Sequence, residues 1–232
     1  MDVSKKTARM AGVLWLLMSV FGMFSQMGFR ERLIVPGDMA ATADLILANQ
    51  LIYRTGFISE LVMLICYLLT GLVLYRLLSS VNKSQAASMM VFVILGTGIG
   101  MLNLLNEFAP LYILSKDLYQ SVYTQGQLQA QAMIYYDLYE HGYVIAHIFF
   151  ALWVLPLGLL IYKSRFLPRI FGIFFVIETI LGLVSAGLHF IFPNPSLETN
   201  LLWVGAVAEF SFMFWLLFRG INTSKILVAD TV

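Results

Sequence analysis

Residues 170–192 read IFGIFFVIETILGLVSAGLHFIF, and this segment decides the fold class. Only Glu178 and His189 within it are ionisable, and its other residues are apolar, small or weakly polar. A transmembrane helix needs about 20 predominantly apolar residues. Lipid offers the backbone no hydrogen-bond partners, so a single segment that crosses it must satisfy its own backbone groups as an α-helix. The segment therefore predicts a membrane-spanning helix.

The composition of the whole chain is also typical of a membrane protein. Of its 232 residues, 60% are hydrophobic and 12% are charged, whereas soluble domains have about 25% charged residues. The formal net charge is +1 and no dense basic patch is present, so we expect no nucleic-acid partner. The expected partners are the lipid bilayer and a small-molecule or lipid ligand. The sequence identifies no protein partner.

Six apolar runs in the chain are long enough to cross a bilayer. They cover residues 10–29, 52–78, 86–114, 142–162, 170–192 and 201–218. The first run exceeds the roughly 7–15 apolar residues of a signal peptide, and no A-x-A-like cleavage site follows it, so we interpret it as an uncleaved helix. The sequence predicts an all-α polytopic membrane protein, with one domain over residues 1–232 built as a single bundle of six transmembrane helices.

The lysine and arginine residues between the runs predict the orientation of the chain. Of 14 such residues, ten fall on one side: Lys5, Lys6, Arg9, Arg76, Lys83, Lys163, Arg165, Arg169, Arg219 and Lys225. The other four are Arg30, Arg32, Arg54 and Lys116. Cytoplasmic loops carry an excess of lysine and arginine. We therefore expect both termini to lie in the cytoplasm.

Two stretches on the outer side predict short helices beyond the spans. A Pro36-Gly37 turn precedes Asp38, which is a suitable N-cap for a short interfacial helix over residues 39–50. Residues 127–140, QLQAQAMIYYDLYE, are expected to extend the fourth span outward. Seven of the 11 tyrosines lie in residues 112–143, which is typical of an aromatic belt at the headgroup level.

Polar and small residues inside the spans follow helical spacing. Glu178, Gly182, Ser185 and His189 are separated by four, three and four residues, so they share one helical face. Similar faces occur in other spans at Gly12, Trp15, Ser19, Gly22 and Gln26, at Gly96, Gly100, Asn103 and Glu107, and at Gly205 and Glu209. Small residues let helices approach closely in lipid. We expect these faces to point at neighbouring helices.

The ionisable residues of the spans are predicted to gather in the outer half of the bilayer. A charged residue at a helix centre costs about 2.5–3.5 kcal/mol on insertion scales. The glutamates must therefore pair, stay protonated or line a wet cavity, and Arg54 is the only basic residue expected at a similar depth. We predict an outward-facing polar pocket with these candidate ligand-binding residues: Arg54, Glu60, Asn103, Glu107, His141, Glu178, His189 and Glu209. The alternative is a set of interhelical hydrogen bonds worth about 0.6–2 kcal/mol each.

Metal and nucleophilic chemistry receive little support from the sequence. A catalytic zinc site needs three protein ligands, and His141 and His147 are six residues apart, which points them to different faces of a helix. Cys66 is the single cysteine and is interpreted as a buried apolar residue. Ser185 and His189 are one turn apart but lack a G-x-S-x-G turn. We predict no metal and no cofactor, and we assign no catalytic residue.

Four segments carry a resemblance to a known family. They are IYRTGFISELVML (52–64), LYRLLSSVNKSQA (74–86), HGYVIAHIFFALWVLPLGLLIYKSRFLPRIFGIF (141–174) and AEFSFMFWLLFRGIN (208–222). Through them the chain resembles, over nearly its whole length, an uncharacterised bacterial membrane family, domain of unknown function 4386. The resemblance implies a bacterial inner-membrane protein with about six helices, and it implies no activity. It places family-level function at Arg54, His141 and Glu209.

We therefore expect a non-enzymatic integral membrane protein of the bacterial cytoplasmic membrane. It would bind a small or amphiphilic ligand in the polar pocket or act as an accessory membrane subunit. Two alternatives stay open. One is an intramembrane enzyme on lipid-like substrates, with Glu209, Glu178 and His189 as acid–base groups. The other is a proton-coupled transporter, for which intramembrane carboxylates are typical.

Overall fold

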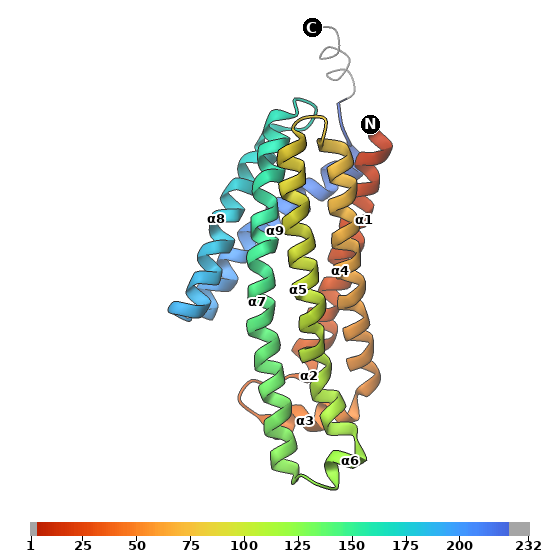
Figure 1. Cartoon of the computed structure of the whole chain (residues 1–232), viewed down its shortest axis with the longest axis vertical. Coiled ribbons are helices and arrows are strands. Elements are labelled where there is room, and N and C mark those ends of the chain that lie inside the picture. The colour runs from red at the N-terminus through yellow and green to blue at the C-terminus, as the bar shows by residue number, and fades with distance from the viewer. Residues whose placement is uncertain (1–3, 223–232) are drawn as a thin grey trace. The chain divides into compact units, whose positions relative to one another are not determined.

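The computed structural model describes residues 4–222, and most of them lie in helices joined by short linkers (Figure 1). No β-strand occurs in that range. The elements in chain order are α1 (Lys5–Met23), η1 (Phe24–Arg30), α2 (Glu31–Leu33), α3 (Met39–Ala48), α4 (Gln50–Leu78), α5 (Lys83–Ser115), α6 (Asp117–Gln120), α7 (Gln125–Lys163), α8 (Arg169–Ile191) and α9 (Pro195–Phe218). Lys225, which entered the orientation count, lies outside the described residues.

Six helical segments are long and apolar enough to cross a membrane. They are Lys5–Leu33, Gln50–Leu78, Lys83–Ser115, Gln125–Lys163, Arg169–Ile191 and Pro195–Phe218. The first of them consists of α1, η1 and α2, which follow one another without a break. The predicted all-α polytopic membrane fold with six candidate spans is confirmed.

Most helices are longer than the apolar runs that predicted them, because polar residues at their ends continue the helical hydrogen bonding. The largest difference is in α7, which has 39 residues and includes residues 127–140. Glutamine, alanine, leucine and glutamate, which are frequent in this stretch, have favourable helix propensities. The predicted helical extension of the fourth span is therefore confirmed.

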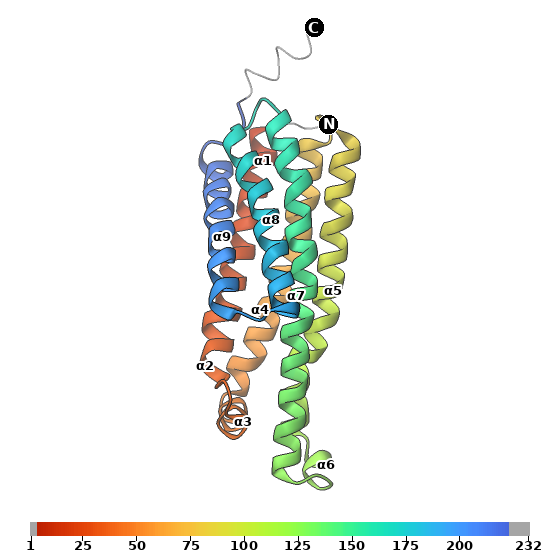
Figure 2. The same ribbon diagram turned by 90° about the vertical axis from the view of Figure 1, so that its left-hand side faces the viewer.

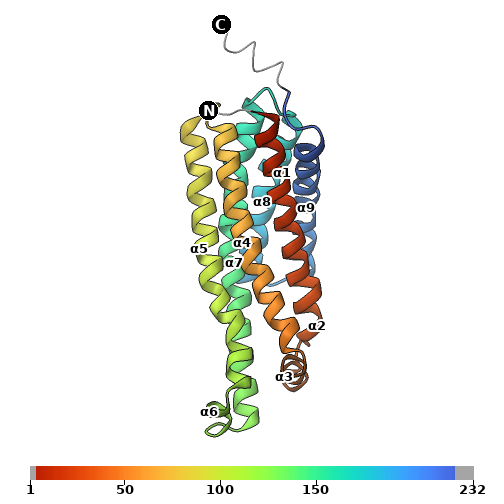
Figure 3. The ribbon, with the colours of Figure 1, turned by 90° about the vertical axis from the view of Figure 1, so that its right-hand side faces the viewer.

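Helix α3 begins where the sequence predicts a helix start. The Asp38 side chain accepts a hydrogen bond from the backbone N–H of Ala41 at 2.9 Å, as an N-cap does. Gly37 precedes it with φ of +79°, a left-handed conformation that glycine adopts without steric cost. Helices α2 and α3 are adjacent (Figure 3). The location of α3 at a membrane interface stays a prediction.

The described residues form two compact units. Unit 1 comprises the described parts of Met1–Leu16, Cys66–Thr97 and Val144–Val232, and unit 2 comprises Leu17–Ile65 and Gly98–Tyr143. Helices α1, α4, α5 and α7 each contribute residues to both units, whereas α8 and α9 belong to unit 1. The single domain over residues 1–232 stays a prediction.

Unit 1 is built around aromatic side chains and close helix contacts. The Trp15 ring centroid lies 5.6 Å from that of Trp153 and 5.8 Å from that of Phe212, and all three side chains are buried. Helices α8 and α9 lie side by side (Figure 2). Helices α7 and α8 touch through their backbones, because a Cβ on Gly172 would lie 2.6 Å from the carbonyl oxygen of Gly158. Such small-residue contacts are what helix packing in lipid favours.

Unit 2 has its own apolar core, formed by residues of η1, α2, α3, α4, α5 and α7. Phe29 and Tyr53 are almost fully buried, with ring centroids 4.6 Å apart in an edge-on arrangement. A side chain at Gly56 would overlap the Phe29 ring, so glycine is what lets η1 approach α4. This contact places the end of η1, and with it Arg30, against α4.

Candidate functional site

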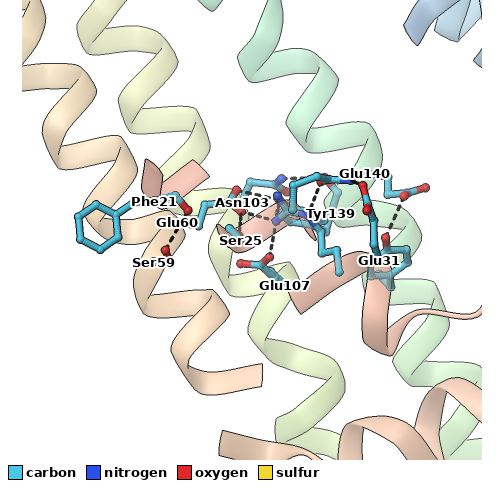
Figure 4. A network of polar contacts seen from close by, with 12 residues as sticks. Phe21, Ser25, Glu31, Ser59, Glu60, Asn103, Glu107, Tyr139 and Glu140 are labelled. Atoms are coloured by element: carbon cyan, nitrogen blue, oxygen red, sulfur yellow. Dashed lines mark hydrogen bonds and ion pairs between the residues drawn. The ribbon is translucent and has the colours of Figure 1, made fainter. Parts of the chain in front are cut away.

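The residues predicted to line a pocket occur in both units. Unit 2 contains Arg54, Glu60, Asn103, Glu107 and His141. Unit 1 contains Glu178, His189 and Glu209. In unit 2, the structure brings Glu60, Asn103 and Glu107 into one polar network (Figure 4).

The network begins at η1, a π-helix of seven residues that continues α1. Ser25 and Arg30 are five residues apart, and in an α-helix they would point about 140° away from each other. The i→i+5 hydrogen bonding of a π-helix brings residues at this spacing onto one side. Both side chains accordingly reach the same oxygen, Oε2 of Glu60. Short π-helical segments occur frequently at functional sites.

Arg30 is the centre of this network. Its Nη1 atom donates to Glu60, to Oε1 of Glu107 at 2.7 Å and to the hydroxyl of Tyr139 at 2.6 Å. Its guanidinium carbon also lies 5.3 Å from the centroid of the Tyr139 ring. We call Ser25, Arg30, Glu60, Glu107 and Tyr139 the Arg30 cluster. Figure 4 shows the labelled members Ser25, Glu60, Glu107 and Tyr139 pointing toward one another.

Glu60 uses both of its carboxylate oxygens. Oε1 accepts from the Tyr139 hydroxyl at 2.7 Å, while Oε2 accepts from the Ser25 hydroxyl at 2.8 Å and from Arg30. Glu60 lies in α4, and its side chain is buried. Its charge is thus matched by one guanidinium and two hydroxyl donors, which is the condition under which a buried carboxylate is tolerated.

Glu107 uses only one of its oxygens. The residue is 0% exposed, and Oε1 is held by Arg30. Oε2 is buried and has no hydrogen-bond partner among residues 4–222. The backbone carbonyl of Glu107 accepts from the Tyr53 hydroxyl, which fixes this part of α5. Buried polar atoms without partners are rare in native proteins, so Oε2 is the exceptional atom of the cluster.

A second layer of hydrogen bonds fixes the cluster in place. Gln26 accepts from Nε of Arg30 at 3.0 Å, which orients the guanidinium. The Asn103 amide donates to the backbone carbonyl of Tyr139 at 2.8 Å and accepts from Asn106 at 3.0 Å. A side chain at Gly142 would overlap the Asn103 amide, so the glycine makes room for this bond between α5 and α7.

In unit 1, Glu178 lies in α8 and Glu209 lies in α9, one turn after Gly205. Glu178 packs against Gly205 of α9, because a Cβ on that glycine would lie 2.8 Å from the Glu178 Cγ. The predicted stripe from Glu178 to Ser185 does face neighbouring helices, since Gly182 and Ser185 are buried.

His189 lies at the end of the same stripe but has a different partner. Its Nδ1 atom lies 3.0 Å from Oε2 of Glu198 in the first turn of α9. The other oxygen of Glu198 accepts from the backbone N–H of Asn194 at 3.0 Å. His189 and Glu198 therefore join the end of α8 to the start of α9.

The sequence also matches the profile of one protein family. A family profile described as Domain of unknown function (DUF4386) matches residues 10–220. The chain belongs to the DUF4386 family. No curated protein and no solved structure matches the sequence of this chain. Of the six candidate spans of this DUF4386 protein, Lys5–Leu33 begins before the matched range and the other five lie within it.

The basic residue that contacts Glu60 and Glu107 in this DUF4386 protein is Arg30, whereas the sequence predicts Arg54 at this depth. A place for Arg54 in a ligand pocket stays a prediction. Arg54 is exposed, and its guanidinium lies 6.0 Å from the centroid of the Phe108 ring. The apolar run ended at Phe29, and this boundary assigned Arg30 to the outer loop. The signal that could have found it is spacing, because Arg30 is the next step of four after Gly22 and Gln26.

The remaining predicted residues add no metal centre to the described part of this DUF4386 protein. His141 lies on an exposed part of α7. Within residues 4–222, no group of three histidine, cysteine, aspartate or glutamate side chains is arranged to hold a metal ion. Cys66 is buried, in agreement with its interpretation as an apolar residue.

Proposed function

We propose that this integral membrane protein binds a small or amphiphilic ligand at the Arg30 cluster, and that the ligand presents a primary ammonium group to Glu107. The observation that carries the proposal is Oε2 of Glu107, a buried carboxylate oxygen with no partner among residues 4–222. An ammonium N–H group supplies both the hydrogen bond and the positive charge that this oxygen lacks.

The charges of the cluster support a cationic ligand. Glu60 and Glu107 share one guanidinium, so one negative charge in the cluster has no counter-charge of its own. A buried unpaired charge is costly, and near the centre of a membrane span the cost is about 2.5–3.5 kcal/mol on insertion scales. A bound ammonium group removes this cost. In its absence, a proton on Glu107 would do the same.

Glu60 has hydrogen-bond donors for both carboxylate oxygens and Glu107 for only one, and this difference favours a ligand site over a purely structural network. A structural ion pair stabilises a fold when the remaining lone pairs are satisfied, as they are at Glu60. Glu107 departs from this rule in an otherwise well-bonded cluster, next to a π-helix. Intramembrane ionisable residues with such surroundings are candidates for function.

We also infer that the protein lies in the bacterial cytoplasmic membrane with both termini in the cytoplasm. Ten of its 14 lysine and arginine residues fall on the side of the termini, which supports this orientation. Arg30 and Glu107 would then lie in the outer half of the membrane, and the ligand would arrive from the outside. The enzyme alternative receives less support, because His189, its third acid–base group, contacts Glu198.

The test is thermal unfolding of the purified full-length chain in detergent, with and without octylamine. We expect octylamine to raise the midpoint, because a ligand that binds only the folded state stabilises it. Octyltrimethylammonium has the same chain and charge but no N–H donor, so it should have little effect. The shift should disappear in Glu107→Gln and persist in the exposed control Glu140→Gln. An equal shift in Glu107→Gln, or equal effects of the two amphiphiles, would contradict the proposal.

A further inference from the structure

The loop between α7 and α8 carries three exposed cations, Lys163, Arg165 and Arg169. A candidate span ends at Lys163 and the next begins at Arg169, so the loop is expected at the level of the lipid headgroups (upper end of Figure 2). No aspartate or glutamate occurs in residues 141–177 or in residues 210–222. None of the three cations forms an ion pair within residues 4–222. Their positive charge is therefore available to an external anion.

Arg165 has a backbone conformation that is unusual for its residue type. Its φ is +60°, and within residues 4–222 no other residue except glycine has a positive φ. A Cβ makes this left-handed conformation unfavourable, which is why glycine usually occupies it. The chain nevertheless has an arginine at this position. An outlier of this kind is a reason to ask what the side chain does.

Neighbouring residues hold the loop in this shape, and the Arg165 side chain does not contribute. The Ser164 hydroxyl accepts from the N–H of Leu167 at 3.3 Å and donates to a backbone carbonyl one turn earlier at 2.8 Å. The N–H of Asn222 donates to the carbonyl of Phe166 at 3.0 Å. The Arg165 guanidinium itself forms no hydrogen bond or ion pair within residues 4–222. The fold thus determines where this guanidinium emerges without using it.

The other two cations are positioned by contacts that leave most of their donors free. The Arg169 guanidinium carbon lies 5.4 Å from the centroid of the Tyr162 ring. Nζ of Lys163 donates to Oε1 of Gln85 at 3.1 Å, which uses one of its three hydrogens. Tyr162 is 46% exposed and Ile170 is 48% exposed. The surface therefore combines free cationic donors with exposed apolar groups, as the phosphate and the adjoining acyl chains of a phospholipid require.

We propose that Lys163, Arg165 and Arg169 form a binding surface for the headgroup of an anionic phospholipid, with Arg165 as its central residue. The planar guanidinium matches the oxygens of a phosphate group with two parallel hydrogen bonds. Basic residues between membrane helices on the cytoplasmic side bind anionic headgroups in this manner. In the orientation inferred above, the loop faces that leaflet. The three residues belong to unit 1 and the Arg30 cluster to unit 2, so the surface does not depend on ligand binding at that cluster.

The test is lipid binding to the purified full-length chain in a non-ionic detergent, measured by native mass spectrometry and by thermal unfolding. We expect dioleoylphosphatidylglycerol to bind more tightly than dioleoylphosphatidylcholine, which has the same acyl chains and no net charge. It should also raise the unfolding midpoint, because it binds the folded state. Inorganic phosphate at the same concentration should not replace the lipid. Equal binding of the two lipids, or an equal rise of the midpoint with phosphate, would overturn the proposal.

Substitutions at position 165 separate lipid binding from a role in folding. Arg165→Gly suits the left-handed backbone, so without lipid its unfolding midpoint should be the same or higher. Its affinity for dioleoylphosphatidylglycerol should fall about fivefold, as expected for the loss of one cation near the lipid surface. Arg165→Lys keeps the charge and should retain most of the affinity.

Arg76→Gln is the matched control, because it removes an exposed cation from the end of α4, outside the proposed surface. It should leave the affinity for dioleoylphosphatidylglycerol nearly unchanged. A loss in Arg76→Gln as large as that in Arg165→Gly would show a diffuse attraction to the whole basic side and would overturn the proposal. An unchanged affinity in Arg165→Gly would overturn it as well.

Discussion

Arg30 holds Glu107 through a single oxygen: Oε1 of Glu107 lies 2.7 Å from Nη1 of Arg30, and Oε2 has no partner among residues 4–222. Glu60 contacts the same nitrogen but receives further donors from Ser25 and Tyr139. Two buried carboxylates thus share one guanidinium, but only that of Glu60 has hydrogen-bond donors for both of its oxygens. This inequality is the basis of the functional proposal.

Replacing Arg30 should destabilise the fold strongly. In Arg30→Gln, Glu60 and Glu107 lose their only cation in the cluster, and removing one partner of a buried ion pair costs about 3–5 kcal/mol. The measurement is thermal or denaturant unfolding of the purified chain in detergent. Arg54→Gln is the matched control. Because Arg54 is exposed, its loss should change the free energy of unfolding by less than about 0.5 kcal/mol. The opposite ranking would contradict the assignment of Arg30 as the basic centre.

Glutamine should lower the stability of the fold at position 60 but not at position 107. Glu60→Gln replaces an acceptor oxygen by an NH₂ group where Ser25, Arg30 or Tyr139 donates, and a hydrogen bond to a charged group is worth about 1.5–3 kcal/mol. Glu107→Gln removes the charge that lacks a counter-charge and can keep an oxygen toward Arg30. We expect the unfolding midpoint to fall in Glu60→Gln and to stay unchanged or rise in Glu107→Gln. A large loss of stability in Glu107→Gln alone would show that the two roles are reversed.

The sequence was sufficient to predict the spans and the start of α3, because both depend on local chemistry. Apolar length determines a membrane helix, and Asp38 followed by an apolar stretch determines a capped helix. The polar stripe around Gly182 and Ser185 was also predictable, since helical spacing fixes which residues share a face.

The pairing of the site residues could not be predicted in the same way. Whether Glu60 contacts Arg30 or Arg54 depends on contacts between helices and on η1. Because η1 is a π-helix, the spacing rules of an α-helix do not predict which of its side chains share a face. Tyr139 was missed because tyrosines of the outer stretch were interpreted as an aromatic belt. Its hydroxyl instead donates to Glu60 and accepts from Arg30.

A methyl group at position 142 should disturb the second layer of the site. In Gly142→Ala the new Cβ overlaps the Asn103 amide, so the hydrogen bond from Asn103 to the Tyr139 carbonyl must lengthen or break. Overpacking of this kind costs about 1–3 kcal/mol. Gly126→Ala lies on the same helix with no atom within 4 Å of the new Cβ, and it should be neutral or stabilising. Equal unfolding midpoints for the two variants would argue against the α5–α7 contact.

The close contact between α7 and α8 can be tested in unit 1 in the same manner. Gly172→Ala places a Cβ 2.6 Å from the carbonyl oxygen of Gly158, a backbone atom that cannot rotate away. We expect a loss of about 1–3 kcal/mol. Gly187→Ala, on the same helix with no atom within 4 Å of the new Cβ, serves as the control and should not lower the unfolding midpoint. A loss in the control as large as that in Gly172→Ala would indicate a general effect on α8.

The most direct measurement for the ligand proposal is an experimental structure of the full-length chain with octylamine bound. We predict that the ammonium nitrogen lies within hydrogen-bond distance, about 2.7–2.9 Å, of Oε2 of Glu107, while Arg30 retains its contacts with Glu60 and Oε1 of Glu107. An ammonium group found only away from the cluster, with Oε2 of Glu107 bonded to another protein group, would contradict the proposal.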